Sequence, residues 1–178
     1  MVGRAFIKNN ENHYLHFITP AQKLDREKKR SLLSPEEARE LDLKMLDAAR
    51  QGQKTLLEPI FEEGADPNAR DERGFPALMV LSTFGCACVL LENYADPMLE
   101  ATLPHTENKI VPFLYHITEG NLGVARLIKG CMTPQVLDAM REAAVEAGKH
   151  ASFCGFRQTA QWIESNFGHN GNGGIHIG

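Results

Sequence analysis

Apolar residues recur every three or four positions along most of this chain, in short stretches that end at glycines. The clearest stretch begins at Ser34, with Pro35 next to it and Glu37 three residues later, a capping box typical of a helix start. Gly52 closes the stretch, whose apolar stripe consists of Leu41, Met45, Ala48 and Ala49. This pattern predicts a helix over residues 34–52.

A second, shorter helix is expected over residues 54–64. Pro59 lies inside it and favours a bend or an irregular start, because proline donates no backbone hydrogen bond. Gly64 ends it, since glycine readily adopts the positive φ of a helix terminus. Its apolar face consists of Leu56, Leu57, Ile60 and Phe61.

The helical period continues to residue 167. Residues 76–85 and 86–97 form two further short apolar stretches, and residues 111–130 predict two helices joined by the turn Gly120-Asn121. A last pair of helices is expected over residues 133–167. Its inward positions are Leu137, Met140, Ala144, Trp162, Ile163 and Phe167.

The two ends of the chain differ from this helical middle. Residues 5–19 contain two apolar-rich runs around Asn9-Asn10-Glu11-Asn12, a pattern that predicts a β-hairpin. A short basic helix is expected to open at Pro20, and residues 168–178 are rich in glycine. We therefore divide the chain into an N-terminal hairpin and helix (1–33), a helical domain (34–167) and a C-terminal tail (168–178).

A helix, a tight turn, a second helix and a hairpin-like loop return every thirty-odd residues, which is typical of an α-solenoid. At this point the chain resembles the ankyrin repeat family. Gly64-Ala65-Asp66-Pro67-Asn68 matches the exit of that family's second helix, and Asp71-Glu72-Arg73-Gly74 matches the loop after it. Val111-Pro112-Phe113 stands at the family's Thr-Pro-Leu position, and Gly120-Asn121 at its helix–helix turn.

The chain also departs from the family pattern. Pro76-Ala77-Leu78-Met79 replaces Thr-Pro-Leu-His, and Asn93-Tyr94-Ala95-Asp96 replaces the usual glycine before Ala-Asp. The second unit is short, and the loop from Met98 to Ile110 is long. The resemblance therefore implies a mainly α, ankyrin-type α-solenoid of three to four divergent repeats, preceded by the short β-hairpin and helix.

The resemblance implies a non-enzymatic module that binds another protein through a concave face and its loop tips. Small divergent members of the family look like proteins that intracellular bacteria and viruses use on host proteins, which would make this chain a host-directed effector or adaptor. Transferred by position, the contact residues are Arg70, Glu72, Arg73, Phe75, Met79, Phe84, Leu103, His105, Lys109, Tyr115 and Glu119. The alternative for Phe75 and Met79 is that they pack the loop onto its neighbour.

Charge and hydropathy narrow the choice of partners. Residues 1–33 hold seven Lys/Arg against three Asp/Glu (+4), and residues 34–178 hold twelve against twenty (−8). Such an acidic majority argues against nucleic acid as the main partner. No apolar run reaches the roughly 18 residues that a bilayer crossing needs, and the first ten residues do not resemble a secretory signal, so we expect a cytoplasmic protein without a membrane partner.

Histidines and cysteines are the candidates for chemistry. His13 and His16 could form a metal-ligand pair in the predicted hairpin, although a solvated strand face explains them more simply. The pair His150 and Cys154 has helical spacing and could serve nucleophilic catalysis, but a turn of the last unit explains it better. We expect His116 to be a packed, hydrogen-bonded core residue and the four cysteines to be free, buried thiols.

We therefore expect no enzyme activity, no cofactor and no bound metal. Two alternatives remain open at the level of the sequence. The chain could be a self-associating structural protein whose hairpin edges pair between copies as a homo-oligomer. It could also have a metal-dependent activity in the N-terminal segment. The short basic run Lys28-Lys29-Arg30 favours a solvated helix face over a nuclear signal or acid-binding patch.

Overall fold

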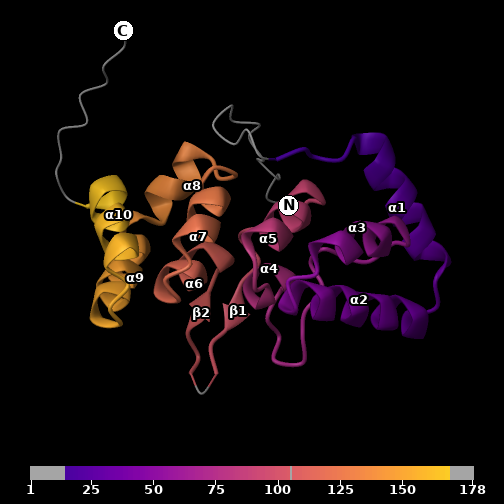
Figure 1. Ribbon diagram of the computed structural model, residues 1–178, viewed down its shortest axis with the longest axis horizontal. Helices are drawn as coiled ribbons and strands as arrows, with labels where there is room; N and C mark the ends of the chain where they lie inside the picture. The colour runs from indigo at the N-terminus through magenta and orange to yellow at the C-terminus, as the bar shows by residue number, and fades with distance from the viewer. Residues whose placement is uncertain (1–14, 105, 169–178) are drawn as a thin grey trace, which may run out of the picture.

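The computed structural model describes residues 15–104 and 106–168, and this part of the chain is mainly helical, as predicted (Figure 1). The helices form two rows along the long axis of the molecule, and a two-stranded sheet projects from one edge. The elements are α1 (Pro20–Leu32), α2 (Pro35–Arg50), α3 (Lys54–Glu62), α4 (Ala77–Val80), α5 (Phe84–Glu92), β1 (Ala101–Thr102), β2 (Lys109–Ile110), α6 (Pro112–Thr118), α7 (Leu122–Lys129), α8 (Pro134–Ala139), α9 (Arg141–Phe153) and α10 (Arg157–Phe167).

The first two helices begin at complete capping boxes. The Ser34 hydroxyl accepts the Glu37 N–H at 3.2 Å, and the Glu37 carboxylate accepts the Ser34 N–H at 2.8 Å. Thr19 and Gln22 repeat this arrangement at the start of α1. Since both boxes precede a proline at the first helical position, the two starts are specified locally.

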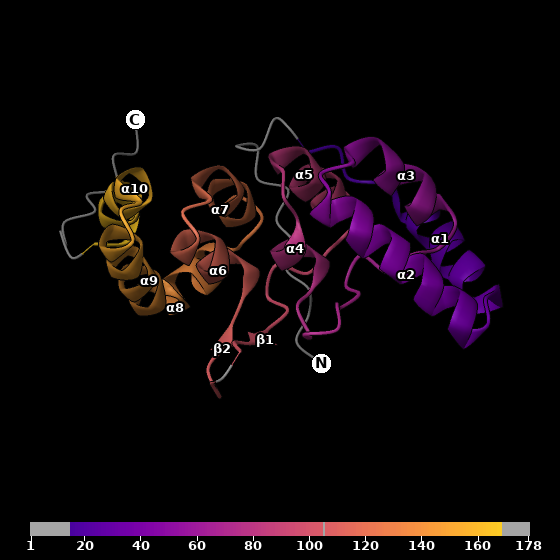
Figure 2. The same cartoon turned by 60° about the horizontal axis from the view of Figure 1, so that its bottom comes forward.

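Consecutive helices pair and then stack on the next pair. In one row α2 packs on α4, α4 on α6 and α6 on α9, while in the other α3 packs on α5 and α5 on α7 (Figures 1 and 2). The α2–α3 and α6–α7 turns each contain a glycine at φ +73°, Gly52 and Gly120. Positive φ lets the chain reverse within a few residues, so the partners of each pair lie side by side.

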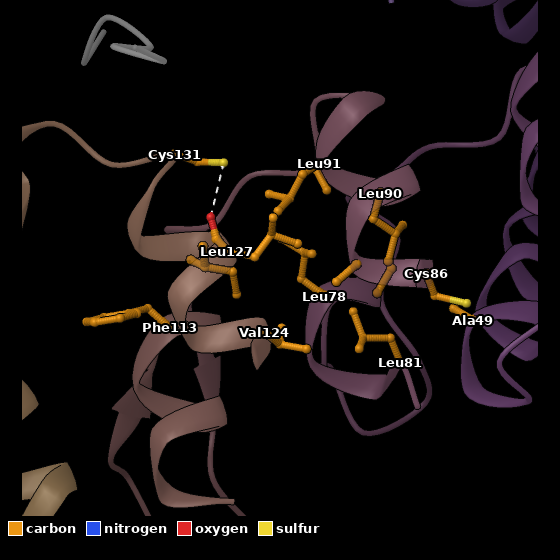
Figure 3. Packing of buried hydrophobic residues seen from close by; sticks show 14 of the residues in the cluster. Ala49, Leu78, Leu81, Cys86, Leu90, Leu91, Phe113, Val124, Leu127 and Cys131 are labelled. Carbon is orange, nitrogen blue, oxygen red and sulfur yellow. Dashed lines mark hydrogen bonds between the residues drawn. The ribbon is translucent and has the colours of Figure 1, made fainter. Parts of the chain in front are cut away.

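One hydrophobic cluster runs through both rows. Figure 3 shows Leu91 of α5 on the side that faces α7, while Cys86 points the other way, toward Ala49 of α2. Leu90, Leu91 and Phe113 are fully buried, and each such side chain contributes about 2 kcal/mol through the area it removes from water. The core is therefore continuous between neighbouring pairs.

Three helix predictions need correction. The stretch predicted over residues 76–85 forms a helix only from Ala77 to Val80, because the Thr83 hydroxyl accepts the Cys86 N–H at 3.3 Å and starts α5 at Phe84. The last pair is three helices, because α8 ends at Ala139 and α9 begins at Arg141. Leu56, predicted on the inner face of α3, is 48% exposed.

The N-terminal helix is present, and residues 15–19 have no regular secondary structure. The rest of the predicted hairpin lies outside the described residues, as does the glycine-rich tail after Gly168. Residues 16–18 lie along the end of α5: the backbone N–H groups of His16 and Ile18 both donate to Glu92. None of the helices in the described part of the chain is long and apolar enough to cross a membrane.

Candidate functional site

The loop from Arg70 to Pro76 is folded around one carboxylate. Arg70 and Pro76 form a β-bridge at its base, and the Asp71 Oδ1 accepts the N–H groups of Arg73 and Phe75 at 3.0 and 2.9 Å. Burial alone would raise the pKa of Asp71, but the hydrogen bonds from Phe75 and Arg73 outweigh it and lower the pKa. Asp71 therefore stays ionised and holds this tip loop in shape.

A small hydrophobic cluster joins the tip loop to the next loop, and we call it the tip cluster: Phe75, Met79, Ala101 and Ile110, with Leu103 and Tyr115 partly buried against them. The Phe75 and Tyr115 rings lie 5.9 Å apart between centroids. Phe75 and Met79 are only 4% and 3% exposed. The sequence-based prediction that these two residues touch a partner therefore needs correction, because their side chains are occupied inside the protein.

The long loop supplies the other half of the tip cluster. Its strands β1 and β2 pair antiparallel, with Ala101 opposite Ile110 and Thr102 opposite Lys109. Ala101 and Ile110 point into the cluster, which leaves Lys109 on the outer face, where it pairs with Glu100 at 3.2 Å. The inserted residues thus form a small hairpin, with an apolar inner face and a charged outer face.

Next to the tip loop, a groove of about 530 Å³ lies against α2. Leu43 is 41% exposed there and supplies apolar surface beside charged side chains. Arg73 and Arg50 both pair with Asp71, at 3.1 and 3.4 Å. We call this the α2 groove, and its lining residues are Leu43, Leu46, Arg50, Asp71, Glu72 and Arg73.

The guanidinium of Arg73 is well oriented at this groove. Its Cζ lies 5.0 Å from the Phe75 ring centroid, and its Nε donates to Asp71 at 3.2 Å. Its side chain nevertheless remains 60% exposed. A guanidinium fixed on one side and open on the other can bind a carboxylate without losing much side-chain entropy.

Further arginines lie beside the same loop. Arg39 of α2 donates to the Arg70 carbonyl at 3.0 Å, and Arg70 donates to the Gly74 carbonyl at 2.7 Å. The groove itself is lined by two arginines and two acidic residues, which gives a formal charge of 2 − 2 = 0. The exposed guanidinium of Arg73 is therefore the feature of the groove that can pair with a carboxylate.

The structure brings some of the predicted contact residues together and separates others. Arg70, Glu72 and Arg73 lie at the tip loop, and Leu103 and Tyr115 pack in the tip cluster beside them.

The environment of Tyr115 also shifts its pKa. Burial raises the pKa of Tyr115, and the negative charge of Glu119 adds to this effect. Glu119 caps the C-terminus of α6, and His105 lies outside the described residues.

Phe84 is a second correction. It was predicted on the same helix as Met79, but it is the first residue of α5, in the other row of helices. It is 43% exposed, and a Cβ added at Gly123 of α7 would lie 3.6 Å from its ring. Phe84 therefore belongs to the edge formed by the helix–helix turns and not to the tip cluster.

Sequence reasoning missed three residues of the groove region. Leu43, Arg39 and Arg50 all come from α2, which was treated as a core helix. A signal for Leu43 was present, since it stands off the apolar stripe of that helix, two residues after Leu41. An apolar residue on a polar helix face is a useful marker of a contact surface.

The candidate residues for chemistry lie apart from this groove. His116 is fully buried: its Nε2 lies 2.6 Å from the Leu78 carbonyl and its Nδ1 3.3 Å from the Asn121 side-chain amide. Burial lowers the pKa of His116 to about 4, although the Leu78 carbonyl opposes this shift. His116 is therefore a packed, hydrogen-bonded core residue, as predicted.

None of the four cysteines forms a disulfide in the described part of the chain. Cys86, Cys88 and Cys131 are buried, as predicted, but Cys154 is exposed, so the prediction of burial is wrong for that residue. Its Sγ lies 3.4 Å from Nε2 of His150, in an exposed part of the surface. Among the described residues, no group of three or more His, Cys, Asp or Glu side chains is placed to hold a metal ion, and His13 lies outside this part.

Comparison with known proteins adds no assignment. No protein-family model matches the chain, and no curated protein matches it either.

Proposed function

We propose that residues 34–167 form a divergent ankyrin-type α-solenoid that binds another protein and has no enzymatic activity of its own. The stacked helix pairs and the continuous core between them support this architecture. Further support comes from the hairpin-like loops that follow α3 and α5 and share the tip cluster. We propose a cytoplasmic location, which agrees with three buried cysteines that form no disulfide.

The contact surface that we propose is the α2 groove together with the outer face of the tip loop. The observation that carries this proposal is the combination of an exposed Leu43 with an Arg73 guanidinium held in place by Asp71 and Phe75. Interfaces commonly use an apolar contact beside an oriented arginine. The partner segment would then carry an apolar side chain next to a carboxylate.

Affinity capture with groove variants tests this function. We expect Leu43→Glu and Arg73→Gln each to weaken retention of the captured partner at least tenfold, because one loses apolar contact and the other a charge-assisted hydrogen bond. Leu56→Glu and Arg157→Gln are the matched controls, since they make the same kinds of change at exposed positions outside the groove. The controls should retain the partner as the unmodified chain does.

Equal retention by all four variants would contradict the groove as the contact surface. Light scattering on the purified chain completes the experiment. If the captured protein is a second copy of this chain and the purified chain is a dimer, the module is a self-associating one. Turnover of a substrate by the purified chain would contradict the proposed absence of enzymatic activity.

A further inference from the structure

Helix α1 lies at one end of the molecule and is attached mainly through charged side chains (Figure 1). None of the residues of α1 is buried, and Leu24 and Leu32 are 52% and 84% exposed. Apolar anchoring comes from the flanking residues Phe17 and Leu33, which pack partly buried against the core. Helices in proteins are normally held by an apolar face, so the attachment of α1 itself depends on polar contacts.

Two arginines on one face of α1 make these contacts. The Arg26 Nη2 donates to Oε1 of Glu58 in α3 at 2.7 Å. Arg30 donates to both carboxylate oxygens of Asp42 in α2, each at 2.8 Å, and to the Gly64 carbonyl at 3.1 Å. Residues four apart lie on the same side of a helix, so a single turn of α1 pairs with two carboxylates.

The rest of the protein orients both carboxylates without help from α1. Oδ1 of Asp42 accepts the Asp66 N–H at 2.9 Å. Oε2 of Glu58 accepts a hydrogen bond from Asn93 Nδ2 at 3.3 Å. The carboxylate of Asp66 lies at the same place, since Asp66 lines the space beneath α1. We call Asp42, Glu58 and Asp66 the acidic surface, and its orientation by the body of the protein makes it a preorganised site for cations.

Helix α1 covers the acidic surface imperfectly. A cavity of about 140 Å³ remains between α1 and the exits of α3 and α5. This is several times the ~15 Å³ that one water molecule needs. Ile18, Pro67 and the Tyr94 ring supply apolar surface to its wall. The residues of α1 that line the cavity are all charged: Lys23, Arg26, Glu27 and Arg30.

The charges of the two faces attract each other, with one exception. The lining residues of α1 carry 3 − 1 = +2, and the three carboxylates of the acidic surface carry −3. The exception is Glu27, which has the same sign of charge as the acidic surface and lies over a partly apolar wall. A helix with an apolar residue in place of Glu27 would therefore match this site better than α1 does.

We propose that the acidic surface is a docking site for a helix of a partner protein that has two arginines four residues apart, and that α1 occupies this site as an autoinhibitory strap. The partner helix places one arginine on Glu58 and the other on Asp42, as α1 does, and an apolar side chain over the cavity wall. Anionic lipid and nucleic acid are repelled by the three carboxylates. The cavity shares no lining residue with the α2 groove, so the two surfaces are separate.

Release of the strap is tested first, in the full-length chain. We expect Arg26→Ala/Arg30→Ala to make the amides of residues 20–32 exchange at least about tenfold faster, with α5 and α7 unchanged. Lys28→Ala/Lys29→Ala is the matched control, because neither lysine lines the cavity and Lys29 pairs with Asp25 on its own helix. Unchanged protection of α1 would overturn the strap. Loss of protection in α5 and α7 would also overturn it, because α1 would then be part of the folding unit.

Docking from a second molecule is tested with a fluorescent peptide of residues 19–33, followed by anisotropy. The peptide should bind the Arg26→Ala/Arg30→Ala chain saturably, since it returns both guanidinium groups to their carboxylates. It should bind the unmodified chain at least about tenfold more weakly, because the attached α1 has a high effective concentration. Absence of saturable binding to the double variant would overturn the docking site.

Peptide variants test what the site recognises. Arg26→Gln/Arg30→Gln in the peptide should weaken binding at least about tenfold, whereas Lys28→Gln/Lys29→Gln, with the same loss of charge, should not. Equal loss in both peptides would overturn the arginine pair and leave general charge attraction. Glu27→Leu should strengthen binding at least about twofold, and weaker binding would overturn the apolar position of the partner helix.

Light scattering separates a partner protein from a second copy of this chain. We expect the oligomeric state of the unmodified chain to be the same as that of the Arg26→Ala/Arg30→Ala variant. A dimer that dissociates in this variant would mean that the occupant is α1 of a second copy, which would overturn a separate partner. These outcomes are distinct from partner capture by the α2 groove, which uses other residues.

Discussion

At the residue scale, the tip loop depends on Asp71. This buried carboxylate accepts two backbone N–H groups of its own loop and pairs with Arg50 and Arg73. The loop in turn orients Arg73 over Phe75 at the edge of the α2 groove. One side chain thus connects the local turn, the packing of the tip cluster and the proposed contact surface.

Replacing Asp71 by asparagine should lower the free energy of unfolding by about 1–3 kcal/mol, since the amide group presents a donor where the carboxylate only accepts. Chemical denaturation measures the change. Asp138→Asn is the control, because Asp138 is exposed and pairs with Arg141 on the surface, where such a change is within about 0.5 kcal/mol. Equal effects of the two substitutions would show that Asp71 does not organise the loop.

His116 makes stability depend on pH. Its folded-state pKa of about 4 lies below the ordinary value of 6.5, so between these two pH values the unfolded chain binds a proton that the folded chain does not. The contribution of His116 to stability is therefore constant well above pH 6.5 and falls by about 1.4 kcal/mol per pH unit from there down to about pH 4. Urea unfolding at pH 7 and pH 5 measures this loss.

His116→Gln is the matched test, because glutamine can still donate to the Leu78 carbonyl but does not titrate. The variant should be less stable at pH 7 and should lose less stability between pH 7 and pH 5 than the unmodified chain. An identical pH dependence in both proteins would mean that other groups cause the acid sensitivity.

At the scale of elements, α1 is docked by a few specific contacts. Arg30 pairs with both carboxylate oxygens of Asp42 at 2.8 Å and also donates to the Gly64 carbonyl at 3.1 Å. The hydrogen bond with Asp42 raises the pKa of Arg30, while partial burial opposes this rise. The basic run of α1 is thus only partly a solvated face, since Arg30 points into the protein.

Gly64 combines a backbone requirement with a packing requirement. It has φ +108°, and a Cβ there would lie 2.8 Å from the backbone nitrogen of Arg30. Gly74 has φ +82° with nothing within 4 Å of such a Cβ. A substitution at Gly74 therefore measures the cost of the backbone conformation alone. We expect Gly74→Ala to cost about 1 kcal/mol and Gly64→Ala clearly more, because α1 must also move.

Denaturation of the two glycine variants, with limited proteolysis of α1, checks this expectation. Faster cleavage within residues 20–32 in Gly64→Ala alone would fit the displacement of the helix. Equal destabilisation and unchanged cleavage would mean that α1 docks without depending on close approach at Gly64.

At the scale of the whole molecule, each helix pair packs mainly on its neighbours, so the central elements have support on two sides. The helices α5 and α7 lie between other pairs, whereas α1 and α10 lie at the two ends (Figure 1). Stability in such a stack is approximately a sum of units and of the interfaces between them. Local opening should therefore be easiest at the ends.

Hydrogen exchange followed by mass spectrometry measures this gradient. We expect the amides of α5 and α7 to exchange at least about tenfold more slowly than those of α1 and α10, because local opening free energies vary across a stack. Uniform protection from α1 to α10 would indicate a single cooperative unit. Stronger protection at the ends than in the centre would contradict the packing hierarchy.

Much of the helical framework was predictable because its signals are local. Ser34 and Glu37 mark a helix start by contacts three residues apart, and the turn Gly120-Asn121 follows from the positive φ that glycine permits. The early end of α4 was missed because its apolar residues continue the helical period past Val80. Only the Thr83 cap on the next helix decides that boundary.

The candidate sites were less predictable because their residues come from distant parts of the chain. Phe75 is of a residue type that is common at protein interfaces, but the β1–β2 hairpin and Tyr115 bury it. Arg26 of α1 and Asn93 at the end of α5 both hydrogen-bond to Glu58 of α3. No short-range pattern reports such a meeting, because it depends on how three helices pack.

By itself, the sequence determined the mainly helical class, the glycine-marked turns and the capped starts of the helices, because these depend on contacts within one or two turns of the chain. Tertiary structure alone decided which apolar side chains were buried, where the α2 groove lies and which distant side chains pair. Burial and pairing are properties of neighbours in space, and for Tyr94 and Ile18 those neighbours are 76 residues apart.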